Sequence, residues 1–296
     1  MKKIILAMRP WSFVVSFISV AITSVVLCYL CYPINWWMAA WAALGVVLFH
    51  AAANTLSDYF DYKSGVDAED TYGQVLLNTK QITLPEMLRL SSVLAILALI
   101  NGVAIWWATG WSMQLLIIGA IGAVVSGMYA WLKFHALGDF AIFCNFGLLP
   151  ALGTAVVATG ALNWEALWFV FLFSPITNAV LHANNMRDIP TDTRANIKTL
   201  PMLIGKRAGQ IIYYIEVFFP IIWTIVCVCF GKLPLYALLV LISIKMVINN
   251  CRDMKRYSED SHAIDHLDEK TAQLQTISSG LIILTTAITI LIEKLF

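Results

Sequence analysis

The chain has 296 residues, of which 60% are hydrophobic and only 12% are charged, and its mean hydropathy is +0.78. A soluble globular domain carries about twice this share of charged residues, so the composition excludes an ordinary soluble protein and indicates a membrane protein. The net charge of +1 provides no long-range field that would favour nucleic acid or an acidic partner.

Apolar runs of membrane-spanning length follow one another along the chain. The first starts beside Lys2, Lys3 and Arg9 and continues to about Tyr32 without a small-residue cleavage site, so a retained helix is expected rather than a signal peptide. Further spans are expected near 37–57, 85–109, 112–132, 139–160, 164–186, 209–230, 233–250 and 274–295. The predicted fold class is all-α, a polytopic membrane bundle of about nine transmembrane helices.

Basic residues are distributed unequally between the connections. Of the 19 Lys and Arg residues, 16 fall on the side of the N-terminus, only Lys232 and Lys294 fall on the opposite side, and Lys245 lies within a span. Cytoplasmic loops carry the excess of Lys and Arg in membrane proteins. The N-terminus and the long loops are therefore predicted to be cytoplasmic and the C-terminus to lie outside, with a belt of tryptophans at the outer interface.

Two polar stretches close two of the apolar runs, and each has an Asn followed by acids. The spacing is i, i+4, i+7 in the first stretch, which places its side chains on one helix face, and i, i+4, i+8 in the second. The two Asn positions are 130 residues apart, and a long polar loop follows each stretch. The residues are Asn54, Asp58 and Asp61 in the first stretch and Asn184, Asp188 and Asp192 in the second.

This layout indicates a weak internal duplication of four helices. Helices one to four are expected within 1–135, helices five to eight within 136–250, and a ninth helix at 274–295. No interdomain linker or low-complexity tract interrupts the chain, so residues 1–296 are expected to form a single membrane-embedded domain.

The acids of both stretches are candidate ligands of Mg²⁺, which takes oxygen ligands and is usually held by one or two carboxylates together with substrate phosphates. A diphosphate beside four aspartates requires such ions, because the like charges would otherwise repel. Basic residues on the same side would bind the remaining phosphate oxygens and stabilise diphosphate as a leaving group. These basic candidates are Arg9, Lys63, Lys133, Arg187 and Lys198.

Other polar residues have an ordinary explanation that is at least as strong as a functional one. The helical histidines His50 and His182, and His135 after Lys133, are expected in packing or hydrogen bonds more often than in acceptor binding. Several acids and one arginine are expected to be solvated, and Asp67 is intermediate; the solvated set is Glu69, Asp70, Glu86, Arg89, Glu259, Asp260, Asp265 and Glu269.

Together these residues resemble the UbiA superfamily of intramembrane aromatic prenyltransferases. The resemblance is carried by Asn-x-x-x-Asp-Tyr-x-Asp-x-x-x-Gly-x-Asp from Asn54 and by Asn-Asn-x-Arg-Asp-x-x-x-Asp from Asn184. Arg9-Pro10 and Tyr129-x-x-x-Lys133 support it. The first motif, with Leu137-Gly138-Asp139 and Phe146-Gly147, is most similar to the 1,4-dihydroxy-2-naphthoate prenyltransferase branch, which makes menaquinone precursors.

The resemblance implies Mg²⁺-dependent transfer of a polyprenyl group from polyprenyl diphosphate to an aromatic acceptor, with dihydroxynaphthoate and decarboxylation to demethylmenaquinol as the favoured case. It also implies a site that faces the cytoplasm in the inner membrane, with the lipid bilayer as partner and no nucleic acid. The resemblance implies that the metal ligands are Asp58, Asp61, Asp188 and Asp192, which would be catalytic together with Lys133. The residues implied to bind the diphosphate are Asn54, Asn184, Arg9, Lys63, Arg187, Lys198 and Tyr129. Tyr59, Tyr62 or Tyr129 would shield the carbocation, with interfacial packing as the alternative.

Three alternatives stay open from the sequence. Another acceptor of the superfamily (4-hydroxybenzoate, homogentisate, haem or a lipid glycerol) fits the same motifs. A secondary transporter would also carry intramembrane acids, although near the bilayer midplane. A CDP-alcohol phosphotransferase would use a single acidic motif. The chain departs from the family in its first long loop, where no Arg lies between Arg9 and Arg89; Lys63 or Lys80 would replace it as a point charge.

Overall fold

The computed structural model describes residues 2–65, 75–195 and 197–295. Asp67, Glu69 and Asp70 lie outside the described residues. Within the described ranges every regular element is helical, and the sole β-type contact is an isolated bridge between His135 and Lys198. The predicted all-α class is confirmed.

Eight helical segments in the described part of the chain are long and apolar enough to cross a membrane. The predicted span near 112–132 is shorter, because α6 (Met113–Gly127) has 15 residues and α7 (Tyr129–Phe134) follows it as a separate helix. The eight are α1 (Lys2–Met8) with η1 (Pro10–Ser12) and α2 (Phe13–Tyr29); α3 (Trp36–Ser64); α5 (Leu84–Ala108); α8 (Gly138–Ile142) with η2 (Phe143–Leu148) and α9 (Leu149–Thr159); α10 (Ala166–Val170) with α11 (Ser174–Arg187); α14 (Lys206–Cys229); η3 (Leu235–Ser243) with α15 (Ile244–Arg256); and η4 (Ser261–Ile264) with α16 (Leu267–Leu295).

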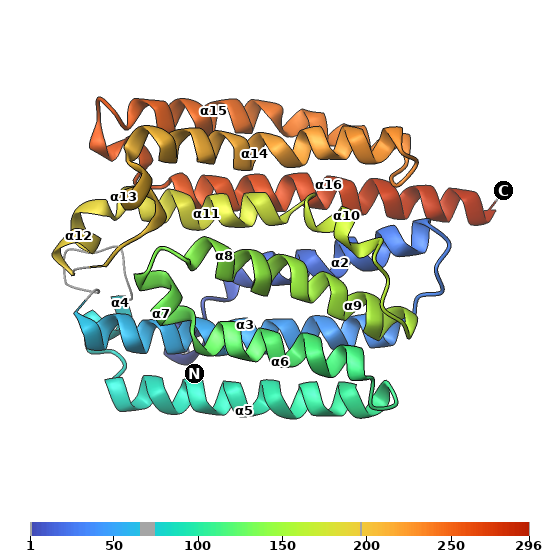
Figure 1. Cartoon of the computed structure of the whole chain (residues 1–296), viewed down its shortest axis with the longest axis horizontal. Coiled ribbons are helices and arrows are strands. Elements are labelled where there is room, and N and C mark those ends of the chain that lie inside the picture. The colour runs from blue at the N-terminus through green and yellow to red at the C-terminus, as the bar shows by residue number, and fades with distance from the viewer. Residues whose placement is uncertain (1, 66–74, 196, 296) are drawn as a thin grey trace.

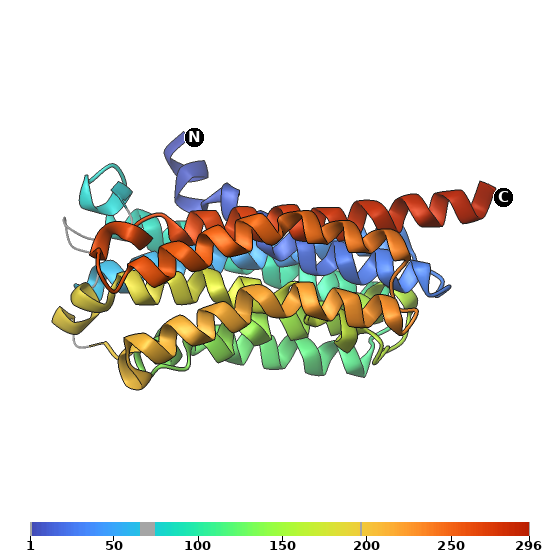
Figure 2. The same ribbon diagram turned by 90° about the horizontal axis from the view of Figure 1, so that it is seen from above.

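The axes of the long helices are roughly parallel, the chain passes back and forth between the two ends of the bundle, and these ends differ (Figures 1 and 2). One end, which we call the loop end, gathers the short helices α4 (Val75–Asn78), α7, α12 (Ile189–Arg194) and α13 (Leu200–Ile204). The other end, which we call the turn end, has only short links between helices. This difference matches the long and short connections expected from the sequence. Which end faces the cytoplasm stays a prediction.

The C-terminal helix α16 packs against α2, α11 and η3, so the last helix of the chain lies beside the first long one. Both helices carry buried hydroxyl residues, including Ser19 and Thr23 on α2 and Ser279 and Thr286 on α16. Small and hydroxyl-bearing residues let membrane helices approach closely, because packing rather than exclusion of water drives their association. The last helices are thus part of the core, although the sequence showed only that they are apolar.

Local sequence signals set the ends of the helices that carry the first motif and its neighbour. Asn35 caps α3 by accepting a hydrogen bond from the Met38 amide at 3.1 Å. Gly65 ends α3 in the left-handed region, with φ of 76°, which glycine adopts without steric cost. At the start of α5, Glu86 accepts from the Thr83 amide at 2.8 Å in a capping box. Glu86 therefore has a structural task, as expected for a residue outside the site.

Candidate active site at the loop end

The first motif starts about three turns before the end of α3, and both of its described aspartates are buried next to a cation. Asp58 is 3% exposed and Asp61 is 8% exposed. Arg9 Nη2 donates to Asp58 Oδ1 at 2.5 Å, and Lys133 Nζ donates to Asp61 Oδ2 at 2.9 Å. Charge-assisted hydrogen bonds of this kind are what make buried carboxylates tolerable. The i, i+4, i+7 spacing has thus placed both acids on the protein-facing side of α3, as predicted.

Arg9 reaches Asp58 from a sharp turn between α1 and η1. Its backbone is left-handed, with φ of 56°, and Pro10 starts η1 immediately afterwards. Asn54 Nδ2 donates to the Met8 carbonyl at 3.2 Å and to Ser12 Oγ at 3.1 Å, which ties this turn to α3. Asn54 therefore holds the Arg9 turn in place, and its amide oxygen takes no part in these two hydrogen bonds.

The second motif lies where α11 ends and α12 begins. Asp188 accepts from Arg187 Nε at 2.8 Å and from Arg187 Nη2 at 3.0 Å, so its neighbour binds it with two nitrogens. Arg187 Nη1 also lies 3.1 Å from Asp268 Oδ2 at the start of α16. Asp192 is 6% exposed, one turn beyond Asp188. The Arg187 guanidinium thus links the second motif to the last helix.

Lys133 on α7 brings the two motifs into one electrostatic environment. Burial by itself would lower the pKa of Lys133, but the Asp61 carboxylate outweighs this effect and raises the pKa, with a smaller contribution from Asp192. Burial raises the pKa of Asp192 to about 6; Lys133 counteracts this rise, and the charges of Asp188 and Asp61 add to it. Acids that are 130 residues apart in the sequence therefore act on one another across Lys133.

A short backbone contact holds α7 against the second motif. The Lys198 amide donates to the Phe134 carbonyl at 3.3 Å, within the isolated bridge between His135 and Lys198. The Lys198 side chain is exposed, so its described role is to connect the segment after α12 to the end of α7. This contact keeps Lys133 between the two acidic stretches.

The remaining predicted site residues make no side-chain ion pair with the motif aspartates among the contacts of the described residues. Lys63 is exposed and lies over the Tyr59 ring at 5.6 Å. Tyr129 and Asn184 are half-buried, and the Asn184 carbonyl accepts from the Asp188 amide at 2.8 Å. Lys80, offered as a substitute for the missing loop Arg, is exposed. The structure therefore brings together four aspartates with Arg9, Lys133 and Arg187.

The histidines near the motifs have packing and hydrogen-bond roles, with one exception. His50 Nδ1 is hydrogen-bonded to Ser16 Oγ at 2.7 Å, and its ring packs edge-on against Phe146. His135 is hydrogen-bonded to the Trp131 carbonyl at 2.7 Å and stacks on the Trp131 ring. His182 lacks such partners and lies beside Asp139 and Glu216.

Two acids with partners near this end were not among the predicted site residues. Asp268 pairs with Arg187, and Glu216 lies 3.6 Å from His182. Glu216 sits inside a predicted span, and a charged residue in a membrane helix is itself a signal of function. That signal was present in the sequence and was missed. Asp268 gives no such signal, because it stands among other acids in a polar connection.

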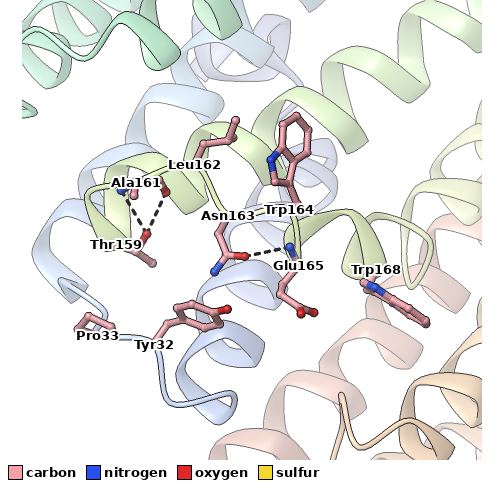
Figure 3. Close-up of a pocket in the computed structure, with 9 residues that line it drawn as sticks. All are labelled: Tyr32, Pro33, Thr159, Ala161, Leu162, Asn163, Trp164, Glu165 and Trp168. Carbon is pink, nitrogen blue, oxygen red and sulfur yellow. Dashed lines mark hydrogen bonds between the residues drawn. The ribbon is translucent and has the colours of Figure 1, made fainter.

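A hollow of about 540 Å³ lies at the turn end, away from the motifs (Figure 3). Tyr32, Trp164 and Trp168 line it, and the Asn163 side chain accepts from the Glu165 amide at 2.9 Å. No pair of acids or acid–histidine pair lines this hollow. Its aromatic lining fits a membrane interface rather than a reaction site.

A bundle of membrane-length helices that gathers two acidic helix ends and their cations at one end has the architecture of an intramembrane prenyltransferase. The UbiA prenyltransferase family matches residues 14–265, and the chain belongs to this family. The UbiA prenyltransferase domain-containing protein 1 homolog of Drosophila melanogaster is 30% identical over 239 residues, which are 74% of this chain and 63% of the relative. The chain thus spans less than two thirds of that relative's length. UbiA prenyltransferase domain-containing protein 1 of Gallus gallus is 27% identical over 92% of this chain and 81% of the relative.

Solved structures share the fold. The apo structure of a UbiA homolog from Aeropyrum pernix K1 matches with a TM-score of 0.71 at 16% identity, over 91% of this chain and 97% of that one. A UbiA homolog from Archaeoglobus fulgidus bound to DMAPP and Mg²⁺ matches with a TM-score of 0.58 at 14% identity, over 97% and 99%. The predicted resemblance to the superfamily is confirmed, whereas the dihydroxynaphthoate branch stays a prediction, because the relatives' names specify no acceptor.

Proposed function

We propose that the chain transfers a prenyl group from a prenyl diphosphate to an aromatic acceptor, with Mg²⁺ bound between the two acidic motifs. The observations that carry this proposal are the pairing of Lys133 with Asp61 at 2.9 Å and the electrostatic interaction of Asp192 with Lys133, Asp188 and Asp61. Asp58 lies one turn before Asp61 on α3. Four carboxylates supply the hard oxygen ligands that Mg²⁺ prefers. The Archaeoglobus homolog of the same fold is bound to DMAPP and Mg²⁺, which adds support.

Each cation of the site has a position suited to a leaving diphosphate. Arg9, Lys133 and Arg187 each lie within 3 Å of a motif carboxylate, so phosphate oxygens bound near those carboxylates would be in reach of the same nitrogens. Bound Mg²⁺ would neutralise the diphosphate and allow it to lie beside the aspartates. The three side chains would then bind the charge that develops on the bridging oxygen as the allylic C–O bond breaks.

The rest of the reaction follows from the chemistry of the substrates. The allylic carbocation is attacked by an electron-rich ring carbon of the acceptor, which forms a C–C bond. With 1,4-dihydroxy-2-naphthoate, the attacked carbon bears the carboxylate, and carbon dioxide leaves with the electron pair returning to the ring. Tyr129, half-buried beside Lys133, would shield the cation with its aromatic face.

We take dihydroxynaphthoate as the first acceptor to test, because the first motif and the Leu137-Gly138-Asp139 and Phe146-Gly147 segments are similar to that branch. The glycine at position 147 also has a structural explanation, since a Cβ there would collide with the Ser174 side chain. Glycine at this position therefore allows η2 to pack closely against α11. Other aromatic acids remain the alternatives.

A membrane assay tests the function and separates the reaction from the acceptor. Membranes containing the chain should convert dihydroxynaphthoate and a polyprenyl diphosphate to a decarboxylated prenyl product, and EDTA should abolish the product until Mg²⁺ is restored. Product formed only with 4-hydroxybenzoate or homogentisate would show that dihydroxynaphthoate is not the acceptor, while prenyl transfer would still be supported. Turnover that persists fully in EDTA would contradict the Mg²⁺ site.

The proposal includes the orientation of the protein in the membrane and its domain organisation. The basic residues favour the loop end on the cytoplasmic side of the inner membrane, where a soluble aromatic acid would enter. The prenyl tail would extend from the loop end along the lipid-facing helices. The 130-residue offset of the two motifs supports a single domain built from two four-helix halves and a closing helix.

A further inference from the structure

Three ionisable side chains meet inside the bundle and belong to none of the proposed diphosphate ligands. They are Asp139 on α8, His182 on α11 and Glu216 on α14. His182 Nδ1 lies 3.8 Å from Asp139 Oδ1 and 3.6 Å from Glu216 Oε2, and the ligand atoms of all three lie within 4.8 Å of one another. Three membrane-length segments that are separate in sequence therefore each contribute one metal-ligating group.

The atoms that face one another in this cluster are buried and have no hydrogen-bond partner among the described residues. This holds for His182 Nδ1, whose side chain is 0% exposed, and for Asp139 Oδ1 and Glu216 Oε2. The separations of 3.6 and 3.8 Å are too long for hydrogen bonds. Buried polar atoms nearly always have a partner, because leaving them unpaired is costly. Several unpaired atoms around one point therefore indicate a missing ligand.

The surrounding residues bring the three groups together. A Cβ on Gly209 would lie 2.6 Å from Met186 Sδ and 3.4 Å from His182 Nε2, so glycine at this position leaves room for these two side chains of α11 beside α14. Glu216 follows Gly209 by seven residues and lies on the same face of α14. On the other side, Asn178 Nδ2 donates to the Asp139 carbonyl at 3.2 Å and fixes the start of α8. The cluster is thus held from both neighbouring helices.

We propose that Asp139, His182 and Glu216 bind a divalent transition-metal ion of the Zn²⁺ type. Bonds of about 2.0–2.2 Å to nitrogen and carboxylate oxygen place neighbouring ligand atoms about 3.3–3.6 Å apart around such an ion. The His182–Glu216 distance of 3.6 Å lies at the upper end of this range, and the His182–Asp139 distance of 3.8 Å lies just above it. The imidazole nitrogen selects against Mg²⁺, which takes oxygen ligands. The ion also balances the two carboxylates in the low-dielectric interior.

The ion would clamp α8, α11 and α14 together just below the second motif. His182 precedes Arg187 by five residues on α11, so the clamp would fix the part of α11 that carries the Arg187–Asp188 pair. Three protein ligands leave a fourth position open. The alternative is a set of neutral carboxyl groups beside a neutral histidine, which needs no ion.

Metal binding by the purified protein distinguishes a bound ion from a set of neutral side chains without one. After chelator treatment and reloading with Zn²⁺ in a large excess of Mg²⁺, the protein should retain one equivalent of Zn²⁺ and gain thermal stability. X-ray absorption at the zinc edge should show only nitrogen and oxygen neighbours at about 2.0–2.2 Å, and no sulfur at about 2.3 Å. Retention of no zinc, or a sulfur shell from the cysteines, would overturn the proposal.

Variants then assign the ligands. His182→Gln and Glu216→Gln should each reduce the retained zinc at least tenfold, while His50→Gln, which changes a buried helical histidine with its own hydrogen-bond partner, should retain it. The double variant Asp58→Asn/Asp188→Asn should also retain the zinc, because these residues belong to the diphosphate site. Unchanged zinc in both His182→Gln and Glu216→Gln would refute the assignment. If these two variants fail to fold, the zinc-edge spectrum of the unmodified protein decides.

Discussion

Replacing Asp58 or Asp188 with asparagine is expected to reduce kcat/KM for prenyl transfer at least about 10²-fold, as loss of one preorganised electrostatic contact does in other active sites. Asparagine keeps the size of each side chain and removes the charge that would bind Mg²⁺. The measurement is the rate of prenyl product formation by the purified variants at saturating Mg²⁺. Because both acids would hold metal on the same diphosphate, the loss in the double variant should be much smaller than the product of the two single losses.

The chain offers a matched control for these substitutions. Asp253 on α15 pairs with Lys270 at 2.6 Å, so Asp253→Asn, like Asp58→Asn and Asp188→Asn, removes the acid of an ion pair at the loop end. This variant should keep nearly full activity, since such an exposed pair contributes little to stability. Activity losses of equal size in Asp253→Asn and Asp58→Asn would point to general damage to the loop end. Full activity in both Asp58→Asn and Asp188→Asn would contradict the two-motif site.

Replacing Lys133 with methionine is expected to lower kcat about 10²- to 10³-fold with a much smaller change in KM. Methionine preserves most of the apolar length of the side chain while removing the ammonium group that lies 2.9 Å from Asp61. The loss should fall on kcat because the charge on the leaving diphosphate grows as the C–O bond breaks, so the interaction is strongest in the transition state. Steady-state kinetics with the prenyl diphosphate varied gives both parameters.

Lys232 provides the comparison for Lys133. It pairs with Glu165 at 2.8 Å at the turn end of the bundle, and its side chain is 24% exposed against 19% for Lys133. Lys232→Met should leave kcat within about twofold of the unmodified protein, because a pair of this kind is worth only about 1 kcal/mol or less. Lys133→Arg should recover part of the activity, since it restores the charge with a different geometry. A Lys133→Met variant that changes KM alone would mean that Lys133 binds substrate without assisting departure of the diphosphate.

The fold was predictable because its main signals are local. Runs of apolar residues fix the position of each helix, and Asn35, Thr83 and Gly65 act as caps within one turn of the helix ends. The span near 112–132 was overestimated, because continuous hydropathy conceals the change of direction at Met128 between α6 and α7. Hydropathy also cannot reveal that α16 packs beside α2, since that contact depends on small buried side chains distant in the sequence.

The candidate site residues could be proposed from the sequence where a pattern repeats. Asp58, Asp61, Asp188 and Asp192 stood out through matched spacing at two helix ends, and Lys133 through its position on the same side of the membrane. The pairing of Arg9 with Asp58 depends on the left-handed turn at Arg9, which no sequence pattern specifies. The cluster around His182 was not predicted as a unit, because its members come from three spans and only their packing brings them together.

The central claim is that both acidic motifs hold one Mg²⁺–diphosphate complex, and calorimetric titration with an unreactive prenyl thiodiphosphate tests it most directly. The unmodified protein should bind one equivalent of the analogue in Mg²⁺ and lose at least about tenfold in affinity in EDTA, because the acids would then repel the diphosphate. Asp58→Asn and Asp188→Asn should each weaken the Mg²⁺-dependent binding. Binding of equal strength with and without Mg²⁺, or full affinity in either variant, would contradict a site shared by the two motifs.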